Sequence, residues 1–334
     1  MILALAGRGS SYWPGANKVP RRGFSLTELM VAMLLAMLLL GFILQIFSSL
    51  SRSVRQTQQL ALLQQNGQLA LNLLQNELQN SGFFGGMSLD QIRDGTSAII
   101  APEGDCVKSD LDSGSFPVRG QPFINLYAAA AASGRQLNCL SSLLPDSEYL
   151  QLKRAIGLNL EASALRDNRF YLQHDWQHPR FVDAVTSDLA AEASYFPYQH
   201  LVFYLQQQTY GGERFPVLMR KRLVRSAAGG ARIHTDSLID GVERLHFEFG
   251  IDASGDGQLN YRLATRQMTE RHWLQLEGRI VSITFYVLLR SLQADRHYQN
   301  SQSYQMGAER FEAPGDHYRR LLLSSTVSLH HNIR

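Results

Sequence analysis

The sequence has no marked excess of one charge and no familiar catalytic motif. It contains 32 Lys and Arg residues against 29 Asp and Glu residues, so a basic surface for nucleic acid is not indicated. The chain has no Gly-x-Ser-x-Gly elbow, Walker loop, dinucleotide fingerprint or Cys-x-x-Cys pair. With 334 residues, 45% of them hydrophobic, the composition is that of a globular protein. We therefore expect a folded protein that is not an enzyme and binds no nucleic acid directly.

Cysteine is also scarce, since the chain has only Cys106 and Cys139. Their spacing fits no metal-binding motif. Both follow the apolar segment described next, on the side of the membrane that we expect to be oxidising. An even count there predicts one disulfide that closes a loop of about 30 residues and stabilises the fold by roughly 3–4 kcal/mol. Two free thiols or a metal pair are the alternatives.

A long apolar run, Phe24–Phe47, follows the basic segment Arg21–Gly23 directly. As a helix it would be about 36 Å long, enough to cross a hydrocarbon core of about 30 Å. Its one charged residue is Glu28. Because a charge inside a membrane costs roughly 2.5–3.5 kcal/mol, such a residue is expected to be functional and to have a partner. Cutting the chain after Gly23 would create a positive partner, the amine of Phe24.

The first 23 residues contain four basic side chains, Arg8, Lys18, Arg21 and Arg22, and no acid. Basic residues next to a membrane segment stay in the cytoplasm, so the chain after Phe47 is expected to be exported.

The segment Arg21–Leu29 resembles the type III signal of type IV prepilins. In that family a peptidase cuts after the glycine, and the new N-terminal residue is N-methylated. The resemblance implies that residues 1–23 are a leader ending at Gly23. It also implies that Phe24 is the methylated mature N-terminus, and that Glu28 serves methylation and subunit packing.

Further segments resemble minor pilins of the PilW type: Leu69–Gly86, Ile239–Asp252, Arg290–Ser291, Tyr318–Arg320 and Ser324–Leu329. The resemblance implies a single-pass protein of the inner membrane, with a periplasmic C-terminal domain, that takes part in assembling or priming a type IV pilus. Its implied partners are the prepilin peptidase and methyltransferase, other minor and major pilins, the inner-membrane assembly platform and membrane lipid. A J-type pseudopilin of type II secretion shares the general pattern. A membrane-anchored periplasmic enzyme or binding module is the alternative of a different class.

The helix is expected to continue past the membrane. Residues 48–80 contain no proline, and apolar positions recur every three or four residues: Leu60, Leu63, Gly67, Leu71, Leu74 and Leu78. This pattern predicts an amphipathic half, residues 48–80, after the membrane half, residues 24–47. The predicted fold class is α+β and pilin-like, with this helix packed on a C-terminal antiparallel sheet.

Residues 81–199 read as an irregular, insertion-rich region. Within it the alanine run Tyr127–Ala132 favours a short helix, whereas Tyr149–Arg154 and Arg169–Gln173 favour strands. Residues 200–334 are predicted to form an antiparallel β domain. Its expected strands are His200–Leu205, Pro216–Val224, Val242–Ile251, Arg279–Arg290 and Tyr318–Leu329.

Three segments offer weak metal-ligand patterns. Asp252, Ser254 and Asp256, followed by glycine, match the first half of a calcium-binding EF-hand loop, but Leu263 occupies the twelfth position and no flanking helices are predicted. A β-turn explains the same residues, so we expect no cofactor, with calcium as the alternative. His174 with His178, and the pair His330–His331, are read as surface segments.

Overall fold

The computed structural model describes residues 23–329, apart from residues 98, 109, 133 and 175–178. Leader residues 1–22, His178 and the pair His330–His331 lie outside the described residues. The chain divides into two compact units, Met1–Gln56 and Thr57–Arg334.

The described part of the first unit is almost entirely the start of helix α1 (Leu26–Gln79). This helix is long and apolar enough to cross a membrane. Its side chains are exposed from Leu26 to Leu50, as expected of a surface that meets lipid or other helices. The prediction of one long N-terminal helix is confirmed.

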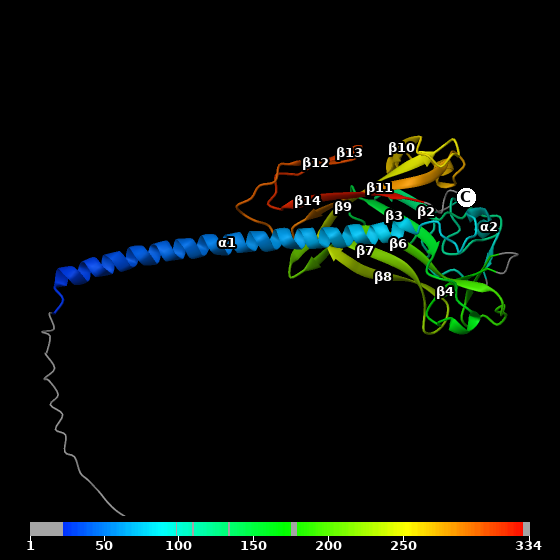
Figure 1. Ribbon diagram of the computed structural model, residues 1–334, viewed down its shortest axis with the longest axis horizontal. Coiled ribbons are helices and arrows are strands. Elements are labelled where there is room, and N and C mark those ends of the chain that lie inside the picture. Colours follow the sequence, from blue (N-terminus) through cyan, green and yellow to red (C-terminus); the bar gives the residue numbers. More distant parts are fainter. Residues whose placement is uncertain (1–22, 98, 109, 133, 175–178, 330–334) are drawn as a thin grey trace, which may run out of the picture. The chain divides into compact units, whose positions relative to one another are not determined.

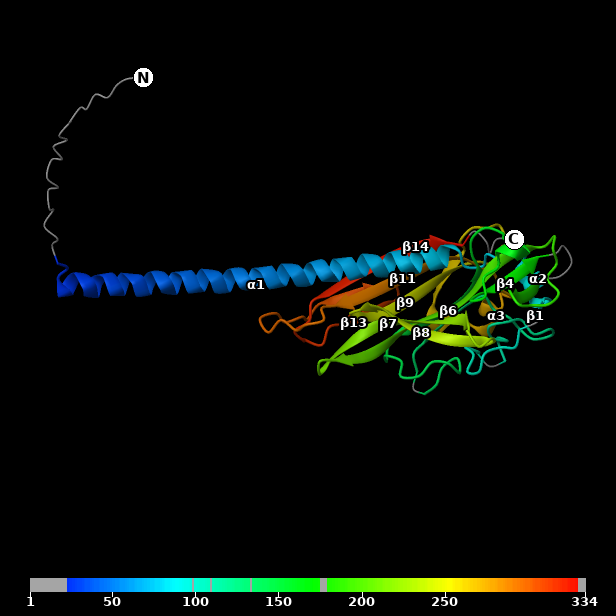
Figure 2. The ribbon, with the colours of Figure 1, turned by 90° about the horizontal axis from the view of Figure 1, so that it is seen from below.

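In the second unit, the end of α1 lies along strands β11 (Arg279–Arg290) and β14 (Arg320–Ser328) (Figures 1 and 2). The buried positions of the helix are Leu63, Gly67, Ala70, Leu74 and Leu78. They repeat every three or four residues, as the amphipathic pattern predicted. Ala70 was not in the predicted stripe, and Leu60, which was, is 41% exposed.

An eight-stranded sheet forms the larger of the two main sheets. Its strands are β1 (Thr96–Ser97), β2 (Leu126–Ala130), β3 (Glu148–Ala155), β4 (Phe170–His174), β5 (Arg180–Asp183), β6 (Ser194–Tyr210), β7 (Glu213–Arg225) and β8 (Ala231–Asp240). Apart from the parallel pair β1–β5, its neighbouring strands are antiparallel.

A four-stranded antiparallel sheet has the order β10-β9-β11-β14. Its remaining strands are β9 (Val242–Asp252) and β10 (Tyr261–Ala264), and a separate hairpin consists of β12 (Ser303–Met306) and β13 (Glu309–Glu312). The short helices are α2 (Leu89–Arg93), α3 (Glu270–Trp273), and the 3-10 turns Ala162–Ala164 and Thr265–Gln267. These strands confirm the predicted α+β class.

Strand β6 crosses residue 200, the predicted boundary between the irregular region and the β domain. Its residues Leu201–Phe203 pair with β3 on one side and with β7 on the other, and its first residues pair with β4. Residues 81–199, expected to be irregular, therefore supply strands β1 to β5 to the same sheet as β6 to β8. The expected boundary falls inside a strand because pairing across β6 is long-range and leaves no local signal.

The short helix predicted over Tyr127–Ala132 is wrong, because Leu126–Ala130 form strand β2. This segment pairs antiparallel with β3, and the ring of Tyr127 lies against Trp273 at a centroid distance of 5.2 Å. Alanine favours a helix only weakly, so a ladder of strand hydrogen bonds and an aromatic contact outweigh that preference.

One hydrophobic core joins the helix and both main sheets. It contains Leu74 of α1, Phe203 of β6, Phe247 of β9 and Phe285 of β11, among other side chains. The end of α1 is also held by an ion pair, in which Arg154 of β3 donates to Glu77 at 2.5 Å. The second half of the helix is thus part of the sheet domain on which it packs.

Candidate processing and assembly site

Helix α1 begins with a reciprocal capping arrangement between Ser25 and Glu28. The backbone N–H of Ser25 donates to Oε2 of Glu28 at 3.1 Å, and the N–H of Glu28 donates to Oγ of Ser25 at 3.1 Å. This is a capping box, which satisfies N–H groups that a helix start otherwise leaves unpaired. The Ser-x-x-Glu spacing signals it in the sequence, and our sequence reasoning missed it.

The predicted cleavage site lies just before this cap. Gly23 and Phe24 precede the first helical residue, Leu26, and both are exposed. The peptide bond between them is therefore outside the hydrogen-bonded helix, where a peptidase can reach it. The assigned roles of Gly23, Phe24 and Glu28 stay predictions, because this geometry permits processing without demonstrating it.

Within residues 23–329 as described, the only hydrogen bonds found for the carboxylate of Glu28 are with Ser25. The local cap therefore accounts for one oxygen, Oε2, and leaves the charge without a described cationic partner. A second role for this charge, in contact with another subunit, is compatible with that arrangement.

The segment Asp240–Gly241 lies where the two main sheets and α1 meet. The N–H of Gly241 donates to Pro216 O of β7, and its carbonyl accepts from the N–H of Arg290 of β11, both at 2.8 Å. The side chain of Asn66 of α1 donates to Asp240 O at 3.1 Å. Gly241 has φ +87°, and a Cβ there would lie 2.7 Å from Arg290 O, so this position requires glycine.

The other segments that resemble PilW-type pilins meet nearby. The N–H of Ser291 donates to Arg319 O at 2.8 Å, and Ser291 Oγ accepts from the N–H of Arg319 at 3.1 Å. The guanidinium of Arg290 stacks on the ring of Tyr318 at 4.1 Å. The residues that carried the resemblance thus stabilise the junction of β11 with β14, which supports the helix.

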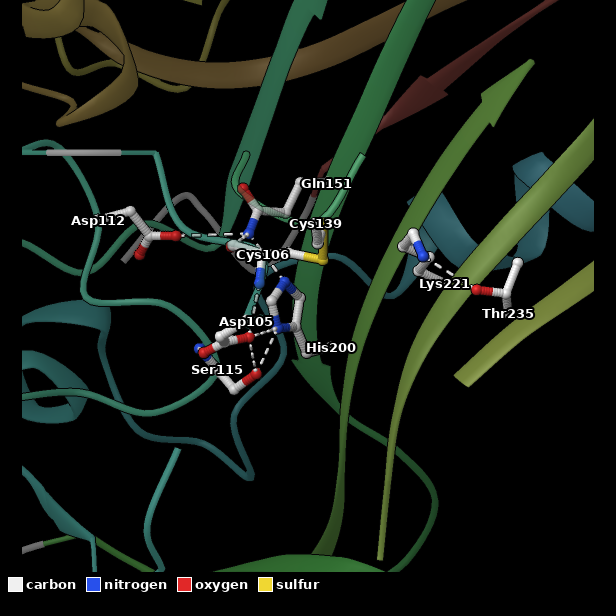
Figure 3. Close-up of a disulfide and its surroundings, with 9 residues drawn as sticks. All are labelled: Asp105, Cys106, Asp112, Ser115, Cys139, Gln151, His200, Lys221 and Thr235. Atoms are coloured by element: carbon white, nitrogen blue, oxygen red, sulfur yellow. Dashed lines mark hydrogen bonds and ion pairs between the residues drawn. A yellow bond between two sulfur atoms is a disulfide. The ribbon is translucent and has the colours of Figure 1, made fainter. Parts of the chain in front are cut away.

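The predicted disulfide between Cys106 and Cys139 is confirmed. It lies beside a buried polar group (Figure 3). Ser115 Oγ donates to Asp105 Oδ1 at 2.6 Å and lies 2.9 Å from Nδ1 of His200. Burial, followed by the charge of Lys153, holds the pKa of His200 well below its usual value, so this imidazole is neutral.

These Ser, His and Asp side chains do not form an open nucleophilic site. Each is less than 10% exposed, and Gln151 Nε2 lies 2.8 Å from the remaining nitrogen of His200. The same amide donates to Cys106 O at 2.8 Å, which ties the group to the disulfide. The arrangement positions the disulfide-closed loop against β3 and β6.

The loop proposed for calcium is organised by its own hydrogen bonds. The carboxylate of Asp252 accepts from the N–H groups of Gly255 and Gly257, at 2.7 and 2.8 Å, and from Ser254 Oγ at 3.1 Å. Although burial raises the pKa of Asp252, these donors lower it overall. Asp256 accepts from the N–H of Gln258. The residues form a tight turn, and calcium binding there stays a hypothesis that a calcium titration would test.

Two family models match the chain. The model for Type IV Pilus-assembly protein W matches residues 202–331, and the model for the Prokaryotic N-terminal methylation motif matches residues 19–44. No curated protein and no solved structure matches the chain.

The long apolar helix and the N-terminal methylation motif fit a membrane-anchored pilin. Within that class, the two matches together support a PilW-like type IV minor pilin. They imply a protein that interacts with prepilin peptidase and with other pilus components. The domains of these families are structural components of pili.

Proposed function

We propose that this chain is a minor pilin that helps to assemble or prime a type IV pilus. It is made as a precursor in the inner membrane with its C-terminal domain in the periplasm. Prepilin peptidase cuts it after Gly23, and Phe24 is then N-methylated. The mature chain joins other minor and major pilins on the inner-membrane assembly platform, and it acts by packing rather than by catalysis.

The match of residues 202–331 to the pilus-assembly family is the observation that carries this proposal. It includes β11 and β14, along which the end of α1 lies, so the matched residues include part of the contact between the domain and the helix. It also favours a pilus subunit over the J-type pseudopilin of type II secretion, because the matched family is described by pilus assembly.

The first experiment is N-terminal mass spectrometry of the full chain, recovered separately from sheared surface filaments and from membranes. We expect a chain beginning with N-methylated Phe24 in the filament fraction. An uncut chain confined to membranes would contradict the proposal and favour the anchored periplasmic enzyme or binding module.

A pair of variants separates the two roles of Glu28. Glu28→Gln keeps a side-chain acceptor for the helix cap but removes the charge, whereas Glu28→Ala removes both. If the charge pairs with the Phe24 amine of a neighbouring subunit and sets the axial register, both variants should be depleted from filaments by at least about tenfold.

Both variants are quantified by immunoblot of filament and membrane fractions, with Thr27→Val as the control at an adjacent position. Normal incorporation of Glu28→Gln would show that the cap alone is required. Normal incorporation and methylation of Glu28→Ala would remove any role for this residue in assembly.

A further inference from the structure

Three side chains of the types that bind metals, from three separate sheets, converge in the second unit. They are Glu148 of β3, His246 of β9 and Glu309 of β13. His246 Nδ1 lies 3.1 Å from Glu148 Oε1 and 3.6 Å from Glu309 Oε2. One ligand atom of each residue lies within 4.8 Å of the others.

Donors hold both carboxylates so that one oxygen of each is directed to the histidine. Oε2 of Glu148 accepts from the N–H of Phe247 at 2.7 Å and from Thr265 Oγ1 at 2.6 Å, which leaves Oε1 toward His246. Arg266 Nε lies 3.3 Å from Oε1 of Glu309, which leaves Oε2 toward the same ring. Outer groups that fix ligand oxygens in this way are characteristic of metal centres.

The two distances from His246 Nδ1 are those expected around a tetrahedral ion, and the two carboxylate oxygens lie within 4.8 Å of each other. With metal–ligand bonds of about 2.0–2.1 Å, ligand atoms around zinc lie about 3.3 Å apart. The two distances from His246 Nδ1, 3.1 and 3.6 Å, fall on either side of that value. Imidazole with two carboxylates suits zinc, and three protein ligands leave a fourth position for water.

We propose that Glu148, His246 and Glu309 form a zinc-binding site that fastens the β12–β13 hairpin to the two main sheets. This inference is independent of the proposed pilus function. Glu148 and His246 are buried, whereas the side chain of Glu309 is 31% exposed. A zinc ion would enter from solvent on the side of Glu309.

The charge balance supports a bound cation. Glu248 also faces this region, because its Oε1 accepts from the N–H of Ala308 in the hairpin turn. The charges of Glu148, Glu309 and Glu248 all act on His246, and Arg266, which pairs with Glu309, has a side chain that is 62% exposed. A zinc ion offsets this negative charge more completely than a proton on the imidazole does.

A proton on His246 is the rival occupant. Burial lowers the pKa of His246, but the hydrogen bond to Glu148 and the charges of Glu148, Glu309 and Glu248 raise it overall. Zinc must displace this proton from Nδ1, so zinc binding is expected to weaken as the pH falls below the pKa of the ring.

The test uses the full-length protein in detergent at about pH 7.5, stripped with a chelator and titrated with Zn²⁺ against a chromophoric competitor. We expect one zinc per chain and a higher melting temperature. Glu309→Gln should bind at least about tenfold more weakly, since even losing an outer partner of a ligand costs 10–100-fold. Glu312→Gln, the same substitution on the same strand at an exposed position, should bind as the wild type does.

A second measurement does not depend on the variants. Co²⁺ added to the stripped wild-type protein should give the intense visible absorption of a tetrahedral site, and Zn²⁺ should abolish it. Failure of the wild type to bind Zn²⁺, equal binding by Glu309→Gln, or loss of binding in Glu312→Gln would each overturn the proposal. So would Co²⁺ bands that Zn²⁺ leaves in place.

Discussion

Arg320, at the start of β14, binds two acidic side chains within the sheet domain. Its guanidinium donates to both oxygens of Glu243 and to both oxygens of Asp316, at 2.6–3.0 Å. The Arg320 side chain is 1% exposed, so solvent screens these ion pairs little. Burial raises the pKa of Asp316, but the hydrogen bonds and charge of Arg320 lower it overall.

This arrangement predicts how stability depends on pH. Because the folded pKa of Asp316 lies below its unfolded value of about 3.9, its contribution is complete above that pH and is lost as the pH falls through the folded pKa. Asp316→Asn should therefore lower the free energy of unfolding at pH 7 by about 1–3 kcal/mol and make the loss of stability below pH ~4 shallower.

Chemical denaturation of the full chain in detergent, at several pH values between about 2 and 7, measures both effects. Glu161→Gln, at an exposed position, is the control and should follow the wild type. An Asp316→Asn profile parallel to that of the wild type would show that this ion pair does not contribute to the acid transition.

Helix α1 is the element in which sequence and tertiary packing agree most closely. Its apolar first half and its periodic second half were both evident before the structure. Close packing at Gly67 was not evident from the sequence. A Cβ there would lie 2.5 Å from Leu323 Cδ1 and 3.4 Å from Leu289 Cδ1. The absence of a side chain at this position lets the helix approach β11 and β14 closely.

A larger side chain at Gly67 should destabilise the sheet domain. Gly67→Leu is expected to lower the free energy of unfolding by about 1–3 kcal/mol, because overpacking displaces the leucines of β11 and β14. Gly41→Leu, on the same helix but with nothing within 4 Å of its Cβ, should leave the domain unchanged. Thermal unfolding of the two variants in detergent gives the comparison, and equal melting temperatures would contradict this packing.

Other elements show where a local sequence pattern is sufficient to predict a strand. Strands His200–Leu205, Pro216–Val224 and Arg279–Arg290 were predicted, because their β-favouring residues lie within a few positions of each other. Strand β8 and the β12–β13 hairpin were not predicted. Strand β8 is half exposed and carries the polar run Thr235, Asp236 and Ser237 in its middle, which interrupts the apolar alternation that marks a half-buried strand.

At the scale of the whole sheet domain, long-range strand pairing determines the architecture. Strand β6 brings residues before and after position 200 into one sheet, and the connection through Gly241 joins that sheet to the four-stranded sheet. The helix, the disulfide-closed loop and the hairpin then attach to different parts of this framework. The candidate zinc site lies where β3, β9 and the β12–β13 hairpin meet. No short motif revealed it, because its three side chains are far apart in the sequence.

The sequence by itself determined a long apolar N-terminal helix, its N-terminal methylation motif and its amphipathic stripe, and it predicted the disulfide that the structure confirms. These depend on contiguous composition, on a spacing of three or four residues, or on there being only one way to pair two cysteines. Only the tertiary structure decided that Tyr127–Ala130 is a strand, that Gly67 lies against Leu323, and that Glu148 meets His246, 98 residues away. Such contacts depend on the register of strands far apart in the chain, and local periodicity does not encode that register.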